Sequence, residues 1–514
     1  MRWIKIGGIV VFLLIFELLL YKIFSRRSLS FGCFDDCANY MAGYFMLQGK
    51  TLYSQIFYNH IMGMADLSFL VQKLHHSINM YDLVLTHRKI IMASSFLFGF
   101  LLMVRFNWKG FLFVVLYELS KFYVFGDRFL GESIAVYAGV YLVGLILEKF
   151  NNKKGLHAVD YILAGMSAFL IIFMREPYIP FALAAFGFLL FGKFSGQKWL
   201  GLAAFFLPLM VVLLTTDIPA FIFNDFTVNA ATAIKGEVQS SRLLGIGLPE
   251  MFLYPVFLLF TGKFNFFHYF LISLSIVFCV GIVERVIAGK KFFALILLLL
   301  LGLANIRVTP PGTTYFEAYH MMVWFGLFLF SAIYFATEFQ KIHMRVVGLG
   351  IICIGWGMVV LGPGSYLYDK IDLQEALLTN FGKVMQVGNV VHDLSHPSDT
   401  LFLDGADDMV YWQSGLFSPY AYSWYTSVMP MIPIYKEARI AMFKKDPPTF
   451  YYDYCSKTAP FHSSLPGFVK ESYQQLYESG KPSCLYILKS KVPAISPNQW
   501  ERAKEAFFTN PNTY

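Results

Sequence analysis

Long uninterrupted apolar segments recur along most of this chain, and they constrain its fold more than any other feature. The first runs from Ile6 to Phe24, behind the basic residues Arg2 and Lys5. About 20 apolar residues cross the hydrocarbon core of a bilayer as a helix. This run is too long for the apolar core of a signal peptide, and no small-residue cleavage site follows it. The sequence therefore predicts an uncleaved signal anchor.

Ten further apolar segments follow, so the sequence predicts an α-helical polytopic membrane protein with about eleven transmembrane helices. They lie near 90–104, 110–125, 130–147, 158–174, 179–193, 199–214, 267–283, 291–305, 318–337 and 346–362. The composition agrees, because 57% of the 514 residues are hydrophobic and 14% are charged, whereas soluble globular proteins carry about 25% charged residues. An ordinary cytosolic enzyme, a disordered protein and a nucleic-acid binder are thereby excluded. The segment 251–260 is expected to be interfacial or re-entrant.

The positive charges between the predicted spans indicate the orientation of the chain. With the N-terminus in the cytoplasm, the short inner loops hold twelve Lys and Arg residues and the short outer loops hold three, Arg128, Arg175 and Arg307. Loops rich in Lys and Arg stay on the cytoplasmic side, so the count supports this orientation. An odd number of spans then puts the C-terminal end outside the cytoplasm. We expect the plasma (inner) membrane of a bacterium.

Three segments outside the predicted spans are long: residues 29–88, 215–250 and 364–514. The last is large enough for a domain, and it alternates strand-like runs with helical patterns. The strand-like runs are 400–403, 449–454 and 485–489, and the helical patterns are 373–387 and 499–507. We therefore expect a membrane domain over residues 1–363 and a small extracytoplasmic α/β domain over residues 364–514.

The six cysteines are too few for a disulfide framework in a chain of this length. Cys33 lies near Cys37, and Cys455 and Cys484 both lie in the C-terminal segment. A disulfide in that segment requires an oxidising compartment. The sequence leaves open whether the C-terminal pair is oxidised or consists of free thiols.

Two adjacent carboxylates, Asp35 and Asp36, follow the first predicted span in a loop expected to be exposed to water. A carboxylate beside the bilayer is costly unless it is hydrated, paired or used in a reaction. On charge alone, a hydrated loop start explains the pair at least as well as a functional site does. The residues that follow in order favour a functional site: Tyr40, Gly49, Tyr53, Asn59 and His60.

The order of these residues resembles the first exoplasmic loop of GT-C glycosyltransferases, the multi-span enzymes that use polyprenyl-phosphate sugars. It is most similar to their family 39-like branch, which includes protein O-mannosyltransferases and the aminoarabinose transferases of lipid A. In that branch an Asp is followed four residues later by a Tyr, as Asp36 is by Tyr40, and then by a Gly and a Tyr before a basic cluster with prolines. This chain lacks those prolines.

The resemblance extends to later outer turns. The matching residues are two acidic residues, a basic residue, and a second basic residue followed by Tyr and His before a late span: Asp127, Glu132, Arg175, Arg307, Tyr319 and His320. The resemblance implies a helical bundle capped by the C-terminal domain, a lipid-linked sugar donor, and transfer in one inverting displacement at the sugar carbon. The acceptor, whether protein, lipid or glycan, is not identified.

Such a transfer needs a base for the acceptor proton and positive charge for the departing phosphate. Asp36 is the first candidate for the base, and Asp35 is the second. Arginine binds phosphate oxygens through a bidentate fork, so Arg175 and Arg307 are the candidates for the donor phosphate. The two arginines are explained equally well as anchors that reach lipid headgroups.

The other candidates have supporting roles. Tyr319 and His320 are expected near the donor phosphate, and a capping or interfacial role for His320 is an equal alternative. The residues expected to support the substrate are Tyr40, Tyr53, His60, Asp127 and Glu132. Asp36 and His60 together would form a mixed oxygen–imidazole site for a divalent cation such as Mg or Mn. No cluster of His, Cys and Asp with close ligand spacing is present in the sequence, so a metal cofactor is left open.

Ionisable residues also occur inside the predicted spans. Glu118 and Lys121 are three residues apart, so they can pair on one face of a helix. Ionisable groups inside a membrane usually face a cavity. Glu17, in the first span, has no partner that the sequence identifies.

Other functions compete with glycosyl transfer. A secondary transporter favours two repeated halves with helices broken near the membrane midplane, and no paired halves are visible here. A glycan polymerase or ligase would share the lipid-linked substrate, but its large outer loop usually lies between two late spans. A non-catalytic scaffold leaves Asp35 and Asp36 unexplained. The expected function is therefore transfer of a sugar from a polyprenyl-phosphate donor to an acceptor hydroxyl on the outer face of the membrane.

Overall fold

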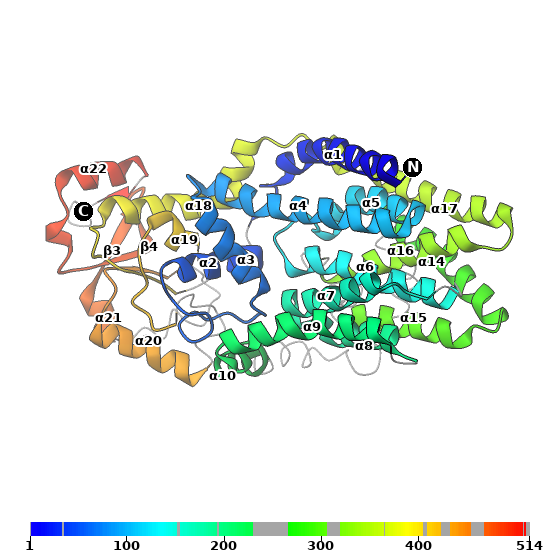
Figure 1. Ribbon diagram of the computed structural model, residues 1–514. Coiled ribbons are helices and arrows are strands. Elements are labelled where there is room, and N and C mark those ends of the chain that lie inside the picture. Colours follow the sequence, from blue (N-terminus) through cyan, green and yellow to red (C-terminus); the bar gives the residue numbers. More distant parts are fainter. Residues whose placement is uncertain are drawn as a thin grey trace.

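Long apolar helices form one end of the molecule, and a mixed group of helices and strands forms the other (Figure 1). The computed structural model describes residues 2–32, 35–151, 155–192, 195–229, 266–305, 319–363, 365–404, 409–422, 432–453, 467–506 and 508–509. Within these ranges, seven helices are long and apolar enough to cross a membrane. They are α1 (Arg2–Arg27), α4 (Met80–Phe106), α6 (Gly131–Asn151), α9 (Gly196–Thr215), α14 (Phe266–Ile287), α16 (Met322–Glu338) and α17 (Ile342–Val360). The chain is therefore a helical protein with several candidate membrane spans, as the sequence predicts.

The other four predicted spans fall on helices of 13, 17, 12 and 14 residues. These are α5 (Trp108–Ser120), α7 (Ala158–Met174), α8 (Ile179–Leu190) and α15 (Lys291–Ala304). A 17-residue helix is roughly 26 Å long, which is less than the roughly 30 Å of a hydrocarbon core. The number of eleven spans therefore stays a prediction. The expected re-entrant segment 251–260 lies outside the described residues.

Helices α6 and α16 form the centre of the helical bundle. In their most apolar stretches, 83% and 94% of the residues are buried, against 11% in α1 and 17% in α9. A close approach explains this pairing, because a Cβ added to Gly326 of α16 would lie 2.2 Å from Cγ2 of Val136 in α6. Small residues let membrane helices pack tightly. Helices α1 and α9 present most of their apolar surface outward, as lipid-facing helices do.

Five short strands and several helices are found in the described residues of the C-terminal part. The strands are β1 (Leu401–Leu403), β2 (Phe450–Tyr452), β3 (Tyr473–Glu478), β4 (Lys481–Leu488) and β5 (Phe508–Thr509). They form one sheet in the order β1-β2-β4-β3-β5, in which β1 and β2 are parallel and the other neighbours are antiparallel. The helices are α18 (Leu373–Leu394), α19 (Met409–Ser414), α20 (Pro433–Lys445), α21 (Gly467–Ser472) and α22 (Pro497–Glu505). The sequence patterns anticipate β1, β2, β4, α18 and α22, whereas the domain boundary at 363–364 stays a prediction.

Helices α2 (Asp35–Leu47) and α3 (Gly63–Leu74) lie between the bundle and the sheet (Figure 1). They pack closely on each other, because a Cβ added to Gly43 of α2 would lie 2.5 Å from Oγ of Ser68 in α3. The other side of α2 faces the C-terminal part, where the rings of Phe45 and Tyr411 meet edge to face with centroids 5.3 Å apart. The segment after α1 and the C-terminal part thus share one apolar core.

Polar contacts reinforce that shared core. The Nζ atom of Lys50 donates hydrogen bonds to the carbonyl oxygens of Ser418 and Tyr420, at 3.2 and 3.4 Å. Burial lowers the pKa of the Lys50 ammonium to about 8. The hydroxyl of Tyr44 donates to the carbonyl of Tyr411 at 3.4 Å. The C-terminal part is therefore fixed directly against the segment that begins at Asp35.

The four cysteines that the structure describes fall into two classes. Cys37 in α2 and Cys484 in β4 each take part in a disulfide bond. Cys279 in α14 and Cys353 in α17 are free. The sequence left the state of the C-terminal pair open, and the structure places Cys484 in a disulfide, while Cys455 lies outside the described residues.

Candidate functional site

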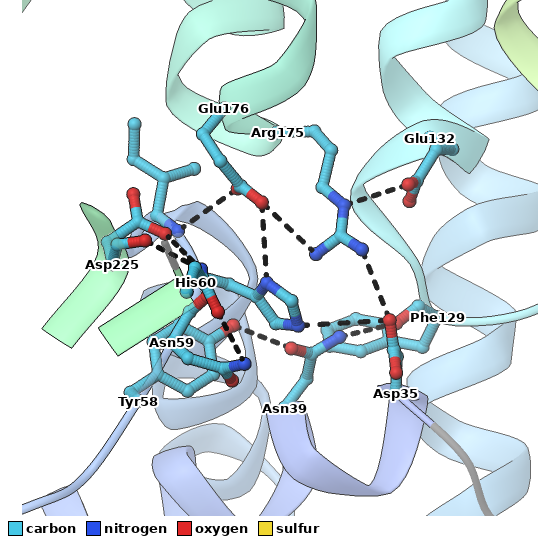
Figure 2. A network of polar contacts seen from close by, with 12 residues as sticks. Asp35, Asn39, Tyr58, Asn59, His60, Phe129, Glu132, Arg175, Glu176 and Asp225 are labelled. Atoms are coloured by element: carbon cyan, nitrogen blue, oxygen red, sulfur yellow. Dashed lines mark hydrogen bonds and ion pairs between the residues drawn. The ribbon is translucent and has the colours of Figure 1, made fainter. Parts of the chain in front are cut away.

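A network of charged side chains joins the start of α2 to the end of α7 (Figure 2). Its centre is Arg175, an extended residue that links α7 to the short helix η2 (Glu176–Tyr178). The guanidinium donates through Nε to Oε1 of Glu132 at 2.8 Å, and through Nη2 to Oδ2 of Asp35 at 3.1 Å. Its Nη1 lies 3.9 Å from Oε1 of Glu176. One buried guanidinium thus holds three carboxylates from three elements.

Asp35 is the most accessible of these carboxylates. Its side chain is 30% exposed, compared with 0% for Glu132 and 14% for Glu176. Asp35 stands in the first turn of α2, where the helix dipole favours negative charge. The helix terminus and Arg175 therefore both place positive charge beside Asp35.

His60 lies between two of the carboxylates, as Figure 2 shows. Its Nε2 is 3.7 Å from Oδ2 of Asp35, and its Nδ1 is 3.5 Å from Oε1 of Glu176. These separations exceed ordinary hydrogen-bond lengths, so the ring is close to both groups without being fixed to either. The backbone of His60 is held instead, because the Tyr53 hydroxyl donates to its carbonyl at 2.9 Å. The imidazole therefore stands between Asp35 and Glu176 on a backbone that is fixed in place.

Neutral polar groups fix α2 beside this network. The hydroxyl of Tyr58 donates to Oδ1 of Asn39 at 2.6 Å. The amide of Asn39 in turn donates to the carbonyl of Phe129 at 2.9 Å (Figure 2). Asn39 is one helical turn after Asp35, so these bonds orient the end of α2 that carries the carboxylate.

Two glycines bring the backbone close to the end of α7. A Cβ added to Gly63 would lie 2.2 Å from the carbonyl oxygen of Phe173, and one added to Gly131 would lie 2.2 Å from that of Met174. Any larger residue at either position would displace the backbone that leads into Arg175. Since Gly131 directly precedes Glu132, this contact sets how close Glu132 comes to the guanidinium.

A fourth carboxyl group, Asp225, approaches from the π-helix η3 (Ile222–Val228), on the other side of His60 from Asp35 (Figure 2). The short helix α10 (Ile218–Phe221) leads into η3. Asp225 is 2% exposed, and its Oδ2 has no hydrogen-bond partner among the described residues. Burial, and then the charge of Glu176, raise the pKa of Asp225 to about 8. Asp225 therefore carries a proton at neutral pH.

Asp225→Asn is expected to change how stability depends on pH. The pKa of about 8 in the folded protein lies above the roughly 3.9 of an unfolded Asp. The contribution of Asp225 is therefore fully present below about pH 4 and is lost as the pH rises toward about 8. At about 1.4 kcal/mol for each pKa unit, the loss is on the order of a few kcal/mol.

The melting temperature of the purified protein, measured near pH 5 and near pH 8.5, checks this expectation. It should fall with pH more steeply in the wild type than in Asp225→Asn. Parallel profiles for the two proteins would contradict the assignment of the proton to Asp225.

The neighbouring Asp36 does not belong to this network. Its side chain is 0% exposed, and its Oδ2 accepts hydrogen bonds from Nη2 of Arg88 at 2.8 Å and from the hydroxyl of Tyr40 at 3.2 Å. Successive residues of a helix point about 100° apart, and this separates the two carboxylates. The expectation that Asp36 is exposed to water is wrong, and Asp35 is the carboxylate of the pair that is open to solvent.

Arg88 was not singled out by the sequence. It belongs to α4 and is 0% exposed. Its Nε and Nη1 have no hydrogen-bond partner among the described residues. The ion pair with Asp36 is therefore the main compensation for burying this guanidinium.

Two other predicted residues lie near the network. Tyr319 is close enough to Arg175 to act on its charge. The rings of Tyr319 and His320 meet edge to face with centroids 4.2 Å apart, and the carbonyl of His320 accepts a hydrogen bond from the Tyr178 hydroxyl at 3.3 Å. Since Tyr178 ends η2, these contacts connect the start of α16 to the network.

Of the two remaining predicted residues, Asp127 is not brought to the network. Oδ2 of Asp127 lies 4.0 Å from Nε of Arg128, a local pair of neighbours in the chain. Arg307 lies outside the described residues.

The predicted metal ligands are not brought together. Asp36 faces Arg88, whereas His60 faces Asp35 and Glu176. Among the described residues, no group of three or more His, Cys, Asp or Glu side chains is arranged to hold a metal ion. The geometry therefore gives no support to a metal shared by Asp36 and His60.

No family model matches this sequence, and comparisons with curated proteins and with solved structures found no match. The functional argument therefore rests on the site itself. An accessible carboxylate flanked by a guanidinium and an imidazole can accept a proton from a hydroxyl group.

Proposed function

We propose that this chain is an integral membrane glycosyltransferase that moves a sugar from a polyprenyl-phosphate donor to an acceptor hydroxyl on the outer face of the membrane. The acceptor oxygen bonds to the anomeric carbon of the sugar, with inversion, while the bond from that carbon to the phosphate oxygen breaks. The acceptor proton passes to a carboxylate of the enzyme, and polyprenyl phosphate leaves.

The observation that carries this proposal is the position of Asp35. It begins the helix that follows the first apolar helix, it is 30% exposed, and Arg175 holds it at 3.1 Å. A general base must be both reachable and ionised. We therefore assign the base to Asp35 rather than to Asp36, which is buried against Arg88.

The proposed role of Arg175 follows from its contacts. Its three nitrogens already face Glu132, Asp35 and Glu176, so we propose that Arg175 orients Asp35 and keeps it ionised. We propose that Arg307 supplies the positive charge for the donor phosphate and that Tyr319 and His320 assist it. This division separates the proton-accepting group from the phosphate-binding group.

A transfer assay with the purified protein in lipid nanodiscs tests the proposal. The donors are polyprenyl phosphates that carry different hexoses, pentoses and amino sugars, and the membrane extract of the source supplies acceptors. The expected result is release of polyprenyl phosphate, with the sugar recovered in a glycosidic bond of inverted configuration. Retention of configuration, or no release with any donor in that extract, would contradict it.

Arg175→Lys is expected to lower transfer by about tenfold or more, because a point charge replaces a planar fork with fixed directions. A single ammonium cannot keep the geometry to both Glu132 and Asp35. The maximal rate should fall at saturating donor while the donor concentration for half-maximal rate stays nearly constant, since this arginine does not bind the phosphate. A large rise in the donor concentration for half-maximal rate, with an unchanged maximal rate, would show instead that Arg175 binds the donor phosphate.

The proposed location is the plasma membrane, with the N-terminus in the cytoplasm and residues 364–514 outside. The cysteines support this arrangement, because Cys37 and Cys484 are disulfide-bonded whereas Cys279 and Cys353 are free. Disulfides persist in oxidising compartments. Cys37 and Cys484 lie in the segments proposed to be outside, whereas Cys279 and Cys353 lie in candidate spans.

Reporter fusions test this orientation. Fusions after Phe150, Gln197 and Lys341 are expected to report the cytoplasm, because Lys and Arg gather in those loops. A fusion after Gly364 is expected to report the extracytoplasmic side. A cytoplasmic report at Gly364 would place the C-terminal part on the wrong side for the proposed reaction.

A further inference from the structure

A second cluster of ionisable side chains lies inside the helical bundle, away from the Arg175 network. Its members come from four helices: Glu17 from α1, Ser95 from α4, Glu118 from α5, and Tyr137 from α6. Lys121 joins them from the short helix η1 (Lys121–Val124). Glu17 stands near the middle of the candidate span Ile6–Arg27, so this cluster lies at the level of the hydrocarbon core.

Four of the five side chains satisfy one another. Nζ of Lys121 forms an ion pair with Oε2 of Glu118 and donates a hydrogen bond to Oγ of Ser95 at 2.9 Å. The Tyr137 hydroxyl donates to Oε1 of Glu118 and lies 2.8 Å from Oγ of Ser95. These residues are all at most 3% exposed. The pair of Glu118 and Lys121 is thus neutral overall and well bonded.

Glu17 is the exception in the cluster. Both of its carboxyl oxygens are shielded from solvent and have no hydrogen-bond partner among the described residues. The charged groups that act on it are Glu118 and Lys121, and these two already neutralise each other. An ionised Glu17 would therefore leave one uncompensated negative charge in the membrane layer, which is a costly arrangement.

We propose that Glu17 is an intramembrane proton-binding site, whose carboxyl group holds the proton while Glu118 remains paired with Lys121. The ligand is a proton rather than a metal ion. A proton needs neither a cavity nor a set of oxygen ligands. No group of three or more acidic, His or Cys side chains that could hold a metal ion is found in the described part of the chain. The site can take up and release a proton within the membrane, a capacity that the proposed sugar transfer does not use.

Infrared spectroscopy of the purified protein tests the proposal directly, because a protonated carboxylic acid has a carbonyl stretching band distinct from the carboxylate bands. In the wild type at neutral pH, Glu17 and the protonated Asp225 should both contribute to this band. Glu17→Gln should lower its intensity and leave the contribution of Asp225, and Glu118→Gln, the matched control in the same cluster, should leave the intensity unchanged. Loss of a carboxylate band instead in Glu17→Gln would overturn the proposal.

Chemical labelling adds a readout that locates the proton. Dicyclohexylcarbodiimide is an apolar reagent that modifies protonated carboxyl groups within membranes. Mass spectrometry should find the modification on the peptide that contains Glu17, and its yield should fall as the pH is raised. Modification of the Glu118 peptide instead would show that the proton sits on the wrong carboxyl group.

The melting temperatures of the variants distinguish the loss of a proton site from damage to the fold. A glutamine has the shape of a protonated glutamate, so Glu17→Gln should melt at nearly the same temperature as the wild type at neutral pH. Glu118→Gln leaves Lys121 charged without its partner, and it should melt lower. A larger loss in Glu17→Gln than in Glu118→Gln would mean that Glu17 is ionised and paired.

Discussion

Asp35→Asn is expected to reduce sugar transfer by about 100-fold or more, the usual scale for a positioned acid–base group. Asparagine keeps the shape of the side chain and an oxygen for the Arg175 donor at 3.1 Å, but it accepts no proton from a hydroxyl. The fold should therefore change little. The release of polyprenyl phosphate by the purified variant, at saturating donor and acceptor, gives the measurement, with melting temperature as the check on folding.

Asp82→Asn provides a matched control for this experiment. Asp82 belongs to the same segment 29–88 and also stands beside a histidine, with its Oδ2 2.9 Å from Nε2 of His75. It has no contact with the Arg175 network among the interactions described. Transfer near the wild-type rate is expected for Asp82→Asn. Equal losses in the two variants, or an active Asp35→Asn, would show that Asp35 is not the base.

Asp36→Asn should have the largest effect on stability, in contrast to Asp35→Asn. Removing the Asp36 charge leaves the guanidinium of Arg88 buried without its counter-charge, and both side chains are 0% exposed. Breaking a buried ion pair from one side costs about 3–5 kcal/mol. The free energy of unfolding, measured with denaturant in detergent micelles, should fall by this order.

A double variant distinguishes the charge effect from damage to α2. Asp36→Asn combined with Arg88→Met removes both charges and replaces the guanidinium by an apolar side chain of similar length. Since a buried pair can be replaced by apolar groups at little cost, the double variant should be more stable than Asp36→Asn alone. A double variant that is less stable than either single variant would contradict this account of the pair.

Much of the helical framework was predictable from the sequence, because it depends on local apolar runs. Every predicted span falls on a described helix, since some 20 consecutive apolar residues leave a segment few alternatives. The pairing of Glu118 with Lys121 was also predictable, because residues three apart share a face of any helix. The number of membrane spans does not follow from these apolar runs, because several of the helices are shorter than a bilayer is thick.

The inner geometry of the site depends on contacts that no local pattern encodes. The choice between Asp35 and Asp36 is decided by Arg88, which lies 52 residues further along the chain, and by Arg175, which lies 140 residues further along. Glu176 directly follows Arg175 in the sequence, and an acidic residue next to a candidate arginine was a signal that could have identified it. Asp225 carried a weaker signal, as one acidic residue inside an apolar stretch, and burial of such a group is itself informative.

The hydrogen bonds from Lys50 to the carbonyl groups of Ser418 and Tyr420 have a consequence for the order of events during synthesis. Lys50 and Ser418 are separated by 368 residues, and a ribosome that adds about 5–20 residues per second needs roughly 20–70 s to make that length. For most of this interval α2 is outside the ribosome, but the surface that will cover it has not been made. The newly made chain must therefore hold an unfinished apolar face for tens of seconds, which makes this face a natural binding place for a chaperone and makes early termination before Ser418 especially damaging.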